Sequence, residues 1–149
     1  MAQFFTLHPD NPQERLVRQA ADIIRDGGVV VLPTDSCYAL VCALGDKKAM
    51  ERISAIRQLD LRHHFTLLCH NLSELGLYAK VDNSQFRLLK AATPGSYTFI
   101  LPATKEVPSR TLHPKRKTIG LRVPDHAIAQ AVLSEVGEAL LSCTLMLPD

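Results

Sequence analysis

One stretch, residues 29–41, constrains most strongly how this chain can fold. It begins with the β-branched apolar run Val29–Leu32, which is typical of a strand buried on both faces. Pro33 ends the hydrogen-bonded ladder because proline has no N–H to donate. The polar triplet Thr-Asp-Ser follows at positions 34–36, where open α/β sheets place a ligand crevice. The same triplet is also typical of an ordinary strand-end turn, in which short polar side chains bind nearby backbone.

Strand and helix patterns alternate along the rest of the chain. Strands are expected at residues 4–7, 29–32, 65–69, 97–101, 118–123 and 139–143. Helices are expected to begin at residues 11–14, 46, 73, 82 and 125, with Asn11, Asp46, Asp82 and Asp125 as their caps. Gly27-Gly28 and Gly137 are expected to end the first and last helices. This alternation predicts a single α/β domain with a twisted mixed sheet flanked by helices.

Helical periodicity also predicts which side chains face the core. Ile56 is expected on the buried face of the second helix, and Phe86 is expected to point inward from the helix that begins near Asp82. The second helix is expected to end near Arg57-Gln58, before a loop over residues 59–64.

The length and composition of the chain limit the classes of protein to which it can belong. At 149 residues and 46% hydrophobic content the chain is expected to fold as one globular unit. The net charge of +2 does not by itself call for nucleic acid. No apolar run approaches the roughly 20 residues of a membrane span, so no membrane partner is expected. The four cysteines form no C-x-x-C pair, which together with the absence of a signal peptide predicts a reducing, cytoplasmic setting.

Several kinds of site find little support in the sequence. His63, His64, Cys69 and His70 match no familiar zinc-ligand spacing. Cys37 has no neighbouring base that would make it a nucleophile. The chain contains neither a P-loop nor a G-x-G-x-x-G motif.

Two basic features have alternative interpretations. The run Lys115, Arg116 and Lys117 is typical of a solvated loop, and it could also line a basic groove that binds nucleic-acid phosphates. Arg122 sits between apolar neighbours at a predicted strand end, where a guanidinium would serve as a bidentate clamp on a carboxylate or phosphate. The alternative for Arg122 is a structural ion pair with one of the 15 acidic residues.

Four segments together resemble the YrdC-like family, and specifically its YciO branch. Residues 33–40, Pro-Thr-Asp-Ser-Cys-Tyr-Ala-Leu, resemble the motif P-T-[DE]-[ST]-x-Y-G-L. Residues 93–101 resemble the family's P-G-x-x-T segment, and residues 117–124 its G-x-R-x-P segment. Arg57-Gln58-Leu59, followed by the strand at 65–69, resembles the YciO version of the K-x-R-P segment. The matches occur in order and in register along the whole chain.

This resemblance implies a YrdC-like fold with a concave basic face. The best understood members are threonylcarbamoyl-AMP synthases, nucleotidyltransferases that act in tRNA modification. They combine L-threonine, bicarbonate and ATP, with Mg²⁺ as the counterion of ATP, to give threonylcarbamoyl-adenylate and pyrophosphate. Members are also described as binding double-stranded RNA. No tightly bound cofactor is implied.

The resemblance also implies roles for individual residues. It assigns substrate binding to Thr34, Ser36, Thr66, Thr98 and Arg122. It assigns nucleotide binding to Arg57 and Ser142. No side chain is expected to act as a nucleophile, because a carbamate formed from threonine attacks the α-phosphate and the protein positions the anions. Asp35 is left with a turn or capping role, with contact to magnesium as the alternative.

Departures from the family pattern keep other functions open. One expected cation is replaced by Leu59, and the family's Ser-Ala-Asn reads Ser-Cys-Thr at residues 142–144. The family also continues past residue 149, so the chain is expected to lack its C-terminal part. Three hypotheses follow: a synthase, weakened or acting on another small carboxylate; a non-catalytic protein that binds tRNA or double-stranded RNA; and a fragment without activity of its own.

Overall fold

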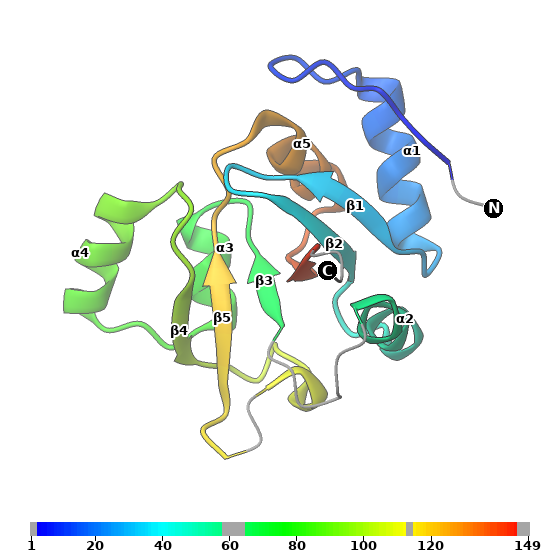
Figure 1. Cartoon of the computed structure of the whole chain (residues 1–149). Helices are drawn as coiled ribbons and strands as arrows, with labels where there is room; N and C mark the ends of the chain where they lie inside the picture. The colour runs from blue at the N-terminus through cyan, green and yellow to red at the C-terminus, as the bar shows by residue number, and fades with distance from the viewer. Residues whose placement is uncertain (1–2, 58–64, 113–114, 146–149) are drawn as a thin grey trace.

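The structure is a computed structural model that describes residues 3–57, 65–112 and 115–145. In this part of the chain, one mixed sheet of six strands is flanked by helices, which confirms the predicted α/β fold (Figure 1). The elements in chain order are α1 Glu14–Arg25, β1 Val30–Pro33, β2 Tyr38–Ala43, α2 Lys47–Arg57, β3 Thr66–Leu68, α3 Leu72–Tyr78, α4 Asn83–Ala92, β4 Phe99–Pro102, the 3-10 turn η1 Ser109–Thr111, β5 Thr118–Arg122, α5 Ala127–Val136 and β6 Leu140–Thr144.

The strands are ordered β1-β2-β6-β3-β5-β4 across the sheet. β3 and β5 run parallel, and the other neighbouring pairs are antiparallel. The sheet therefore brings together segments that are distant in sequence, because β6 lies between β2 and β3 and the last strand becomes a central one.

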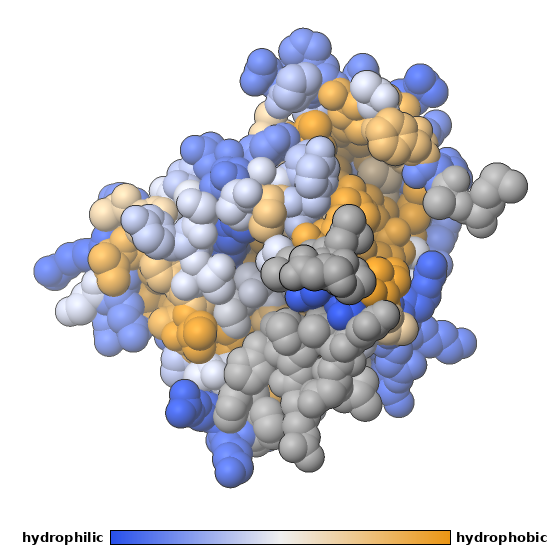
Figure 2. Space-filling view, in the orientation of Figure 1, coloured by the Kyte–Doolittle hydropathy of each residue, from blue (hydrophilic) through white to orange (hydrophobic). Residues whose placement is uncertain are grey.

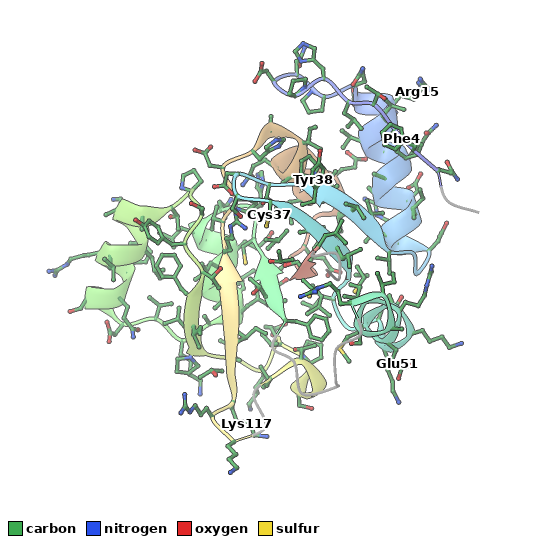
Figure 3. All side chains as sticks on the ribbon, viewed as in Figure 1. Phe4, Arg15, Cys37, Tyr38, Glu51 and Lys117 are labelled. Atoms are coloured by element: carbon green, nitrogen blue, oxygen red, sulfur yellow. The ribbon has the colours of Figure 1, made fainter. Side chains whose placement is uncertain are left out.

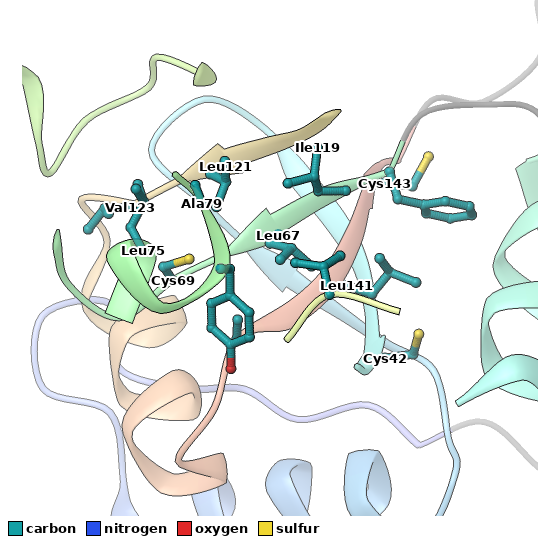
Figure 4. Packing of buried hydrophobic residues seen from close by; sticks show 14 of the residues in the cluster. Cys42, Leu67, Cys69, Leu75, Ala79, Ile119, Leu121, Val123, Leu141 and Cys143 are labelled. Atoms are coloured by element: carbon teal, nitrogen blue, oxygen red, sulfur yellow. The ribbon is translucent and has the colours of Figure 1, made fainter. Parts of the chain in front are cut away.

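One face of the sheet packs on the larger hydrophobic core. Leu67, Ile119, Leu121 and Leu141 alternate onto this face and pack with side chains of α2 and α3. Figure 4 shows these side chains close together in the cluster. Burial of this continuous apolar surface holds the central strands in register.

The opposite face, called the site face below, is covered over only part of its width. α1 packs on α5, and together they cover β1 and β2 and the apolar side chains Val41, Leu68 and Leu140. Among the described residues, this second cluster includes none from β4 or β5. Ile100 of β4 is 70% exposed in consequence. In Figure 2 the surface over β5 is mostly pale, which marks side chains of intermediate hydropathy.

Two predicted element starts differ from the structure. Asn11 does not cap α1, since the helix begins two residues later and its N-cap is Gln13. The Asn11 backbone N–H donates to His8 Nδ1 within a preceding turn. Asp125 does not cap α5; His126 takes that position and its Nδ1 accepts from the Ile128 N–H. Asp46 and Asp82 cap α2 and α4 as predicted.

Four predictions of strand formation or burial are wrong. Residues 4–7 form no strand, and β1 pairs with β2 alone within the described chain. β1 is therefore an edge strand, and Val31 is 46% exposed where burial on both faces was expected. Ile56 and Phe86 are also exposed, since their helices bury only the narrower stripes that contain Ile53 and Leu89.

Some predictions fall outside the described residues: the loop at 59–64 with His63, His64 and Leu59, the helix end at Gln58, and the chain end at 147–149. Of the helices in the described part of the chain, none has the length and apolar character needed to cross a membrane.

Candidate functional site

A row of small and hydroxylated residues crosses the uncovered part of the site face. Thr66 of β3 is the register partner of Ser142 on β6 and of Gly120 on β5, and Gly120 pairs in turn with Ile100 on β4. The Ser142 hydroxyl donates to the Thr66 carbonyl at 2.9 Å, which ties β6 to β3 at this row. Because side chains alternate along each strand, these residues share the site face with Arg122, two positions beyond Gly120.

Gly120 makes this row hollow. A Cβ atom at Gly120 would lie 3.0 Å from Thr66 Oγ1 and 3.2 Å from Thr98 Cγ2. Above it is a cavity of about 70 Å³, half of whose lining residues are threonines. The lining is formed by Phe65, Thr66, Thr98, Ile100, Thr111, Thr118, Ile119 and Gly120. The cavity therefore offers hydroxyl groups and a few apolar walls to a group of only a few atoms.

The turn between β1 and β2 closes on the side chain of Thr34. The Thr34 hydroxyl donates to the Cys37 carbonyl at 2.5 Å and accepts from the Cys37 N–H at 3.2 Å. The Thr34 N–H donates to the same carbonyl at 3.0 Å. Ser36 is exposed, with its hydroxyl 3.5 Å from that of Thr34. This closed turn fixes the direction in which Asp35 projects.

Arg122 is the buried charge of the site, with a side chain 9% exposed. Its Nη2 donates to the Asp35 carboxylate and lies 3.4 Å from the Thr34 hydroxyl. Its Nε donates to the Gly95 carbonyl at 3.5 Å. The sequence left open whether Arg122 is a clamp or an ion-pair partner. The structure shows the ion pair, formed with Asp35, and also shows guanidinium donors that this pair does not use.

The structure brings together most of the residues predicted to bind substrate. Thr34 and Ser36 lie beside Arg122, and Thr66 and Thr98 line the adjacent cavity with Ser142 next to Thr66. Two spatial groups result, one at the β1–β2 turn and one across β3, β5 and β6. They meet on β5, where Gly120 and Arg122 face the same side.

Two sets of predicted residues lie elsewhere. Arg57 is in the last turn of α2, half-buried, and its Nε is buried without a hydrogen-bond partner. Lys115, Arg116 and Lys117 are exposed and precede the start of β5, at the end of that strand opposite Arg122. Figure 3 shows Lys117 far along the strand from Cys37 and Tyr38.

The cysteines are free, and three of them are buried hydrophobes. Desolvation by burial raises the pKa of the Cys42 thiol to about 12, and burial raises the pKa of Cys69 as well. Cys69 points into the larger core, away from a zinc role (Figure 4). Within the described ranges, no group of three or more His, Cys, Asp or Glu side chains is placed to hold a metal ion.

Two features escaped the sequence reasoning. Asp35 was assigned a turn role, and its pairing with Arg122 across 87 positions leaves no local sequence signal. A groove of about 470 Å³ also opens beyond the ends of β3 and β5, lined in part by His70, Lys90 and Gln130. The His70 Nδ1 is buried there without a hydrogen-bond partner.

The site is suited to binding an anion. It offers a guanidinium of low exposure, several hydroxyls and a small cavity, whereas the buried thiols are held protonated. Such a site can hold and orient a carboxylate or phosphate. It offers no activated side-chain nucleophile among the described residues.

Comparison with known proteins agrees with this picture. A family model covering Sua5, YciO and YrdC, described as telomere recombination, matches residues 22–149. The uncharacterised protein YciO of Escherichia coli K12 is 63% identical over 148 residues, which cover 99% of this chain and 72% of that protein. The crystal structure of E. coli YciO superposes with a TM-score of 0.96 at the same coverage.

More distant relatives carry an enzyme name. A threonylcarbamoyl-AMP synthase of Chromobacterium violaceum is 33% identical over 135 residues, covering 90% of this chain and 69% of that protein. A structure of P. abyssi Sua5 superposes with a TM-score of 0.84 at 25% identity, covering 91% of this chain and 41% of that one.

Proposed function

The chain belongs to the Sua5/YciO/YrdC family, and on this premise we propose that it is an adenylyl-transfer enzyme of the threonylcarbamoyl-AMP synthase type. Its substrates would be ATP, bicarbonate and a small amino-acid carboxylate, L-threonine being the first candidate. The name of the 33% identical relatives supports this reaction.

The observation that carries the proposal is the position of Arg122. A guanidinium with a side chain 9% exposed lies beside the hydroxyl of Thr34, on the sheet face that also carries the hydroxylated row of β3, β5 and β6. In a site of low exposure, charge-assisted hydrogen bonds to a carboxylate are stronger than they would be in bulk water. Arg122 would hold the substrate carboxylate, while the cavity lined by Thr66 and Thr98 would receive its short side chain.

The proposed chemistry needs positioning more than side-chain reactivity. The amino group of threonine adds to bicarbonate to give a carbamate, with loss of water. A carbamate oxygen then forms a bond to the α-phosphorus of ATP, the bond from that phosphorus to the bridging oxygen breaks, and pyrophosphate leaves. Orientation of two anions and stabilisation of the developing charge provide most of such a rate enhancement.

ATP would bind beside the carboxylate site. Ser142 lies at the row next to Thr66, and the Arg57 Nε has no hydrogen-bond partner among the described residues, so both are candidates for the phosphates. Mg²⁺ would arrive as the counterion of ATP, held mainly by phosphate oxygens, as is usual for this small, strongly hydrated ion.

The test is pyrophosphate release from ATP in the presence of L-threonine, bicarbonate and Mg²⁺. Wild type is compared with Arg122→Ala and with Arg15→Ala, which removes an exposed arginine on α1 (Figure 3). Loss of a buried charged contact is expected to lower kcat/KM on the order of 100-fold for Arg122→Ala. Arg15→Ala should behave as wild type.

Two results would contradict this function. One is pyrophosphate release that does not depend on threonine, and the other is release by Arg122→Ala at the wild-type rate. Mass spectrometry of the product distinguishes a threonylcarbamoyl-adenylate from the AMP and pyrophosphate of simple ATP hydrolysis.

A second candidate function is binding of tRNA or double-stranded RNA without catalysis. It is favoured by the exposed run Lys115, Arg116 and Lys117 before β5. Phosphate contacts release counterions, so the logarithm of the binding constant should fall linearly with the logarithm of salt concentration. Replacing all three residues by Ala should reduce that slope by roughly two to three. An unchanged slope in a gel-shift titration would assign any RNA binding to another surface.

A further inference from the structure

The carboxylate of Asp35 forms an ion pair with the Arg122 guanidinium, which is the group proposed to hold the substrate carboxylate. We propose that Asp35 is an internal competitor, which a substrate carboxylate must displace from Arg122 before it binds. This inference rests on the proposed function, because it assigns Arg122 to the substrate carboxylate. It makes Asp35 a determinant of both affinity and specificity in this site.

The turn between β1 and β2 places the Asp35 side chain against Arg122. Thr34 and Cys37 are joined by three hydrogen bonds that close the turn around the intervening residues. The side chain of Asp35 is only 15% exposed although the residue as a whole is exposed, since its backbone faces solvent and its carboxylate faces Arg122. The pairing is therefore built into the turn.

The Asp35 carboxylate is held by one partner. Among the described residues it accepts hydrogen bonds from Arg122 alone. The carboxylates of Asp46 and Asp82 contrast with it, because each accepts a backbone N–H at the start of a helix. A side-chain rotation would thus move the Asp35 carboxylate from Arg122 to solvent without breaking a backbone hydrogen bond.

The Arg122 guanidinium would keep its orientation after such a rotation. Its Nε remains bonded to the Gly95 carbonyl, and its Nη2 remains near the Thr34 hydroxyl. The N–H groups of Nη1 make no hydrogen bond to any described residue and are available to a second carboxylate. An incoming carboxylate could therefore replace Asp35 on a guanidinium that is already oriented.

The exchange has a consequence for specificity. While Asp35 is in place the site is close to neutral, so a simple anion gains little by entering it. A ligand that also bonds to the hydroxyls of Thr66 and Thr98 can offset the loss of the internal pair. Asp35 would in this way reject simple carboxylates and admit those that fit the cavity.

The test compares binding of acetate and of L-threonine to wild type, Asp35→Asn and Glu51→Gln. Asparagine keeps an oxygen that can accept from Arg122, and Glu51→Gln removes the same charge from an exposed position on α2 (Figure 3). Dissociation constants come from NMR titrations that follow the Arg122 Nε–H resonance. Asp35→Asn should bind acetate on the order of tenfold more tightly than wild type, and Glu51→Gln should match wild type.

The outcomes separate this inference from the proposed function. The inference would be overturned if Asp35→Asn bound acetate as tightly as wild type or more weakly. Equal binding would mean that Asp35 does not affect acetate binding, and weaker binding would mean that Asp35 helps to hold acetate. If acetate binding tightens but neither protein binds L-threonine, the internal competitor stands and L-threonine is excluded as the substrate. If Glu51→Gln also bound acetate more tightly than wild type, the cause would be the change in net charge and not the loss of the Asp35 carboxylate. That result would also overturn the inference.

A measurement on wild type needs no substitution that could disturb folding. During an acetate titration, the side-chain carboxylate ¹³C resonance of Asp35 should move toward the position of a free aspartate. It should do so with the same midpoint as the Arg122 Nε–H resonance. Movement of the Arg122 resonance with a stationary Asp35 resonance would show that the ligand binds without displacement and would overturn the inference.

Discussion

Gly120 illustrates how a single missing side chain creates the candidate site. Its two cross-strand partners are Thr66 and Ile100, and the side chains of Thr66 and Thr98 lie closest to the position where a Cβ would project. Any other residue would fill the cavity from below. Glycine here provides space, and not the left-handed backbone conformation for which glycine is more often needed.

Substitution Gly120→Ala should therefore impair both ligand binding and folding. The new methyl group would lie 3.0 Å from Thr66 Oγ1 and 3.2 Å from Thr98 Cγ2, so both side chains must shift. We expect a stability loss of about 1–3 kcal/mol, as is usual for overpacking, and a loss of L-threonine binding of at least tenfold. Urea unfolding and an NMR titration measure the two effects.

A matched double variant tests the physical reason for this effect. Thr98→Ser removes the Cγ2 methyl that would meet the new Cβ, so it should restore part of the affinity in a Gly120→Ala background. If the two substitutions are additive, contact with Thr98 is not the cause of the loss.

At the scale of elements, glycine acts through the backbone. Gly137 follows α5 with φ of 85° and its N–H bonded to the Leu133 carbonyl, an arrangement typical of a left-handed C-cap. Gly76 lies inside α3 and has no need for that conformation. In both positions a Cβ would meet no atom within 4 Å, so steric contact does not complicate the comparison.

The two glycine-to-alanine substitutions should change stability in opposite directions. Gly137→Ala places a side chain in the left-handed region and should cost about 1 kcal/mol. Gly76→Ala should add about 0.5–1 kcal/mol because alanine is the better helix former and restricts the unfolded chain. Urea midpoints at constant m-value measure both changes. A shift in the same direction for both would contradict the assignment of Gly137 as the helix stop.

For the whole molecule, the division of the sheet into two faces explains the chemistry of the cysteines. Cys42, Cys69 and Cys143 all alternate onto the face that packs on the larger core, where they are 0–5% exposed. A thiolate is poorly solvated there. Desolvation consequently raises the pKa of Cys42 to about 12 and also raises the pKa of Cys69.

This burial predicts that the fold loses stability in alkali. The unfolded thiol ionises near pH 8.5 and the folded Cys42 thiol near pH 12, so the unfolded state binds fewer protons between these values. The contribution of Cys42 is thus fully present below about pH 8.5 and is lost as pH rises toward 12, by roughly 1 kcal/mol per pH unit.

Urea unfolding under reducing conditions at pH 8 and pH 10 measures this loss. Cys42→Ala will be less stable than wild type at pH 8, because it leaves a small cavity. The difference between the two proteins should narrow at pH 10. A difference that is the same at both pH values would show that Cys42 does not titrate on unfolding in this range.

The sequence by itself determined the features that depend on local physics. The five helices, five of the six predicted strands, the caps at Asp46 and Asp82 and the stop at Gly137 were predicted correctly, because each depends on residues a few positions apart. The strand β2 was not predicted, and the strand predicted at residues 4–7 does not form. The predicted cap at Asn11 was wrong because α1 begins two residues later, with Gln13 as its N-cap.

Only the tertiary structure decided which strands lie side by side and which charges meet. β1 has the composition of a central strand but lies at an edge, and the last strand of the described chain lies between β2 and β3. The row of Thr66, Gly120 and Ser142 and the pairing of Arg122 with Asp35 depend on this strand order. Register and order come from long-range burial of one sheet face, which no local pattern specifies.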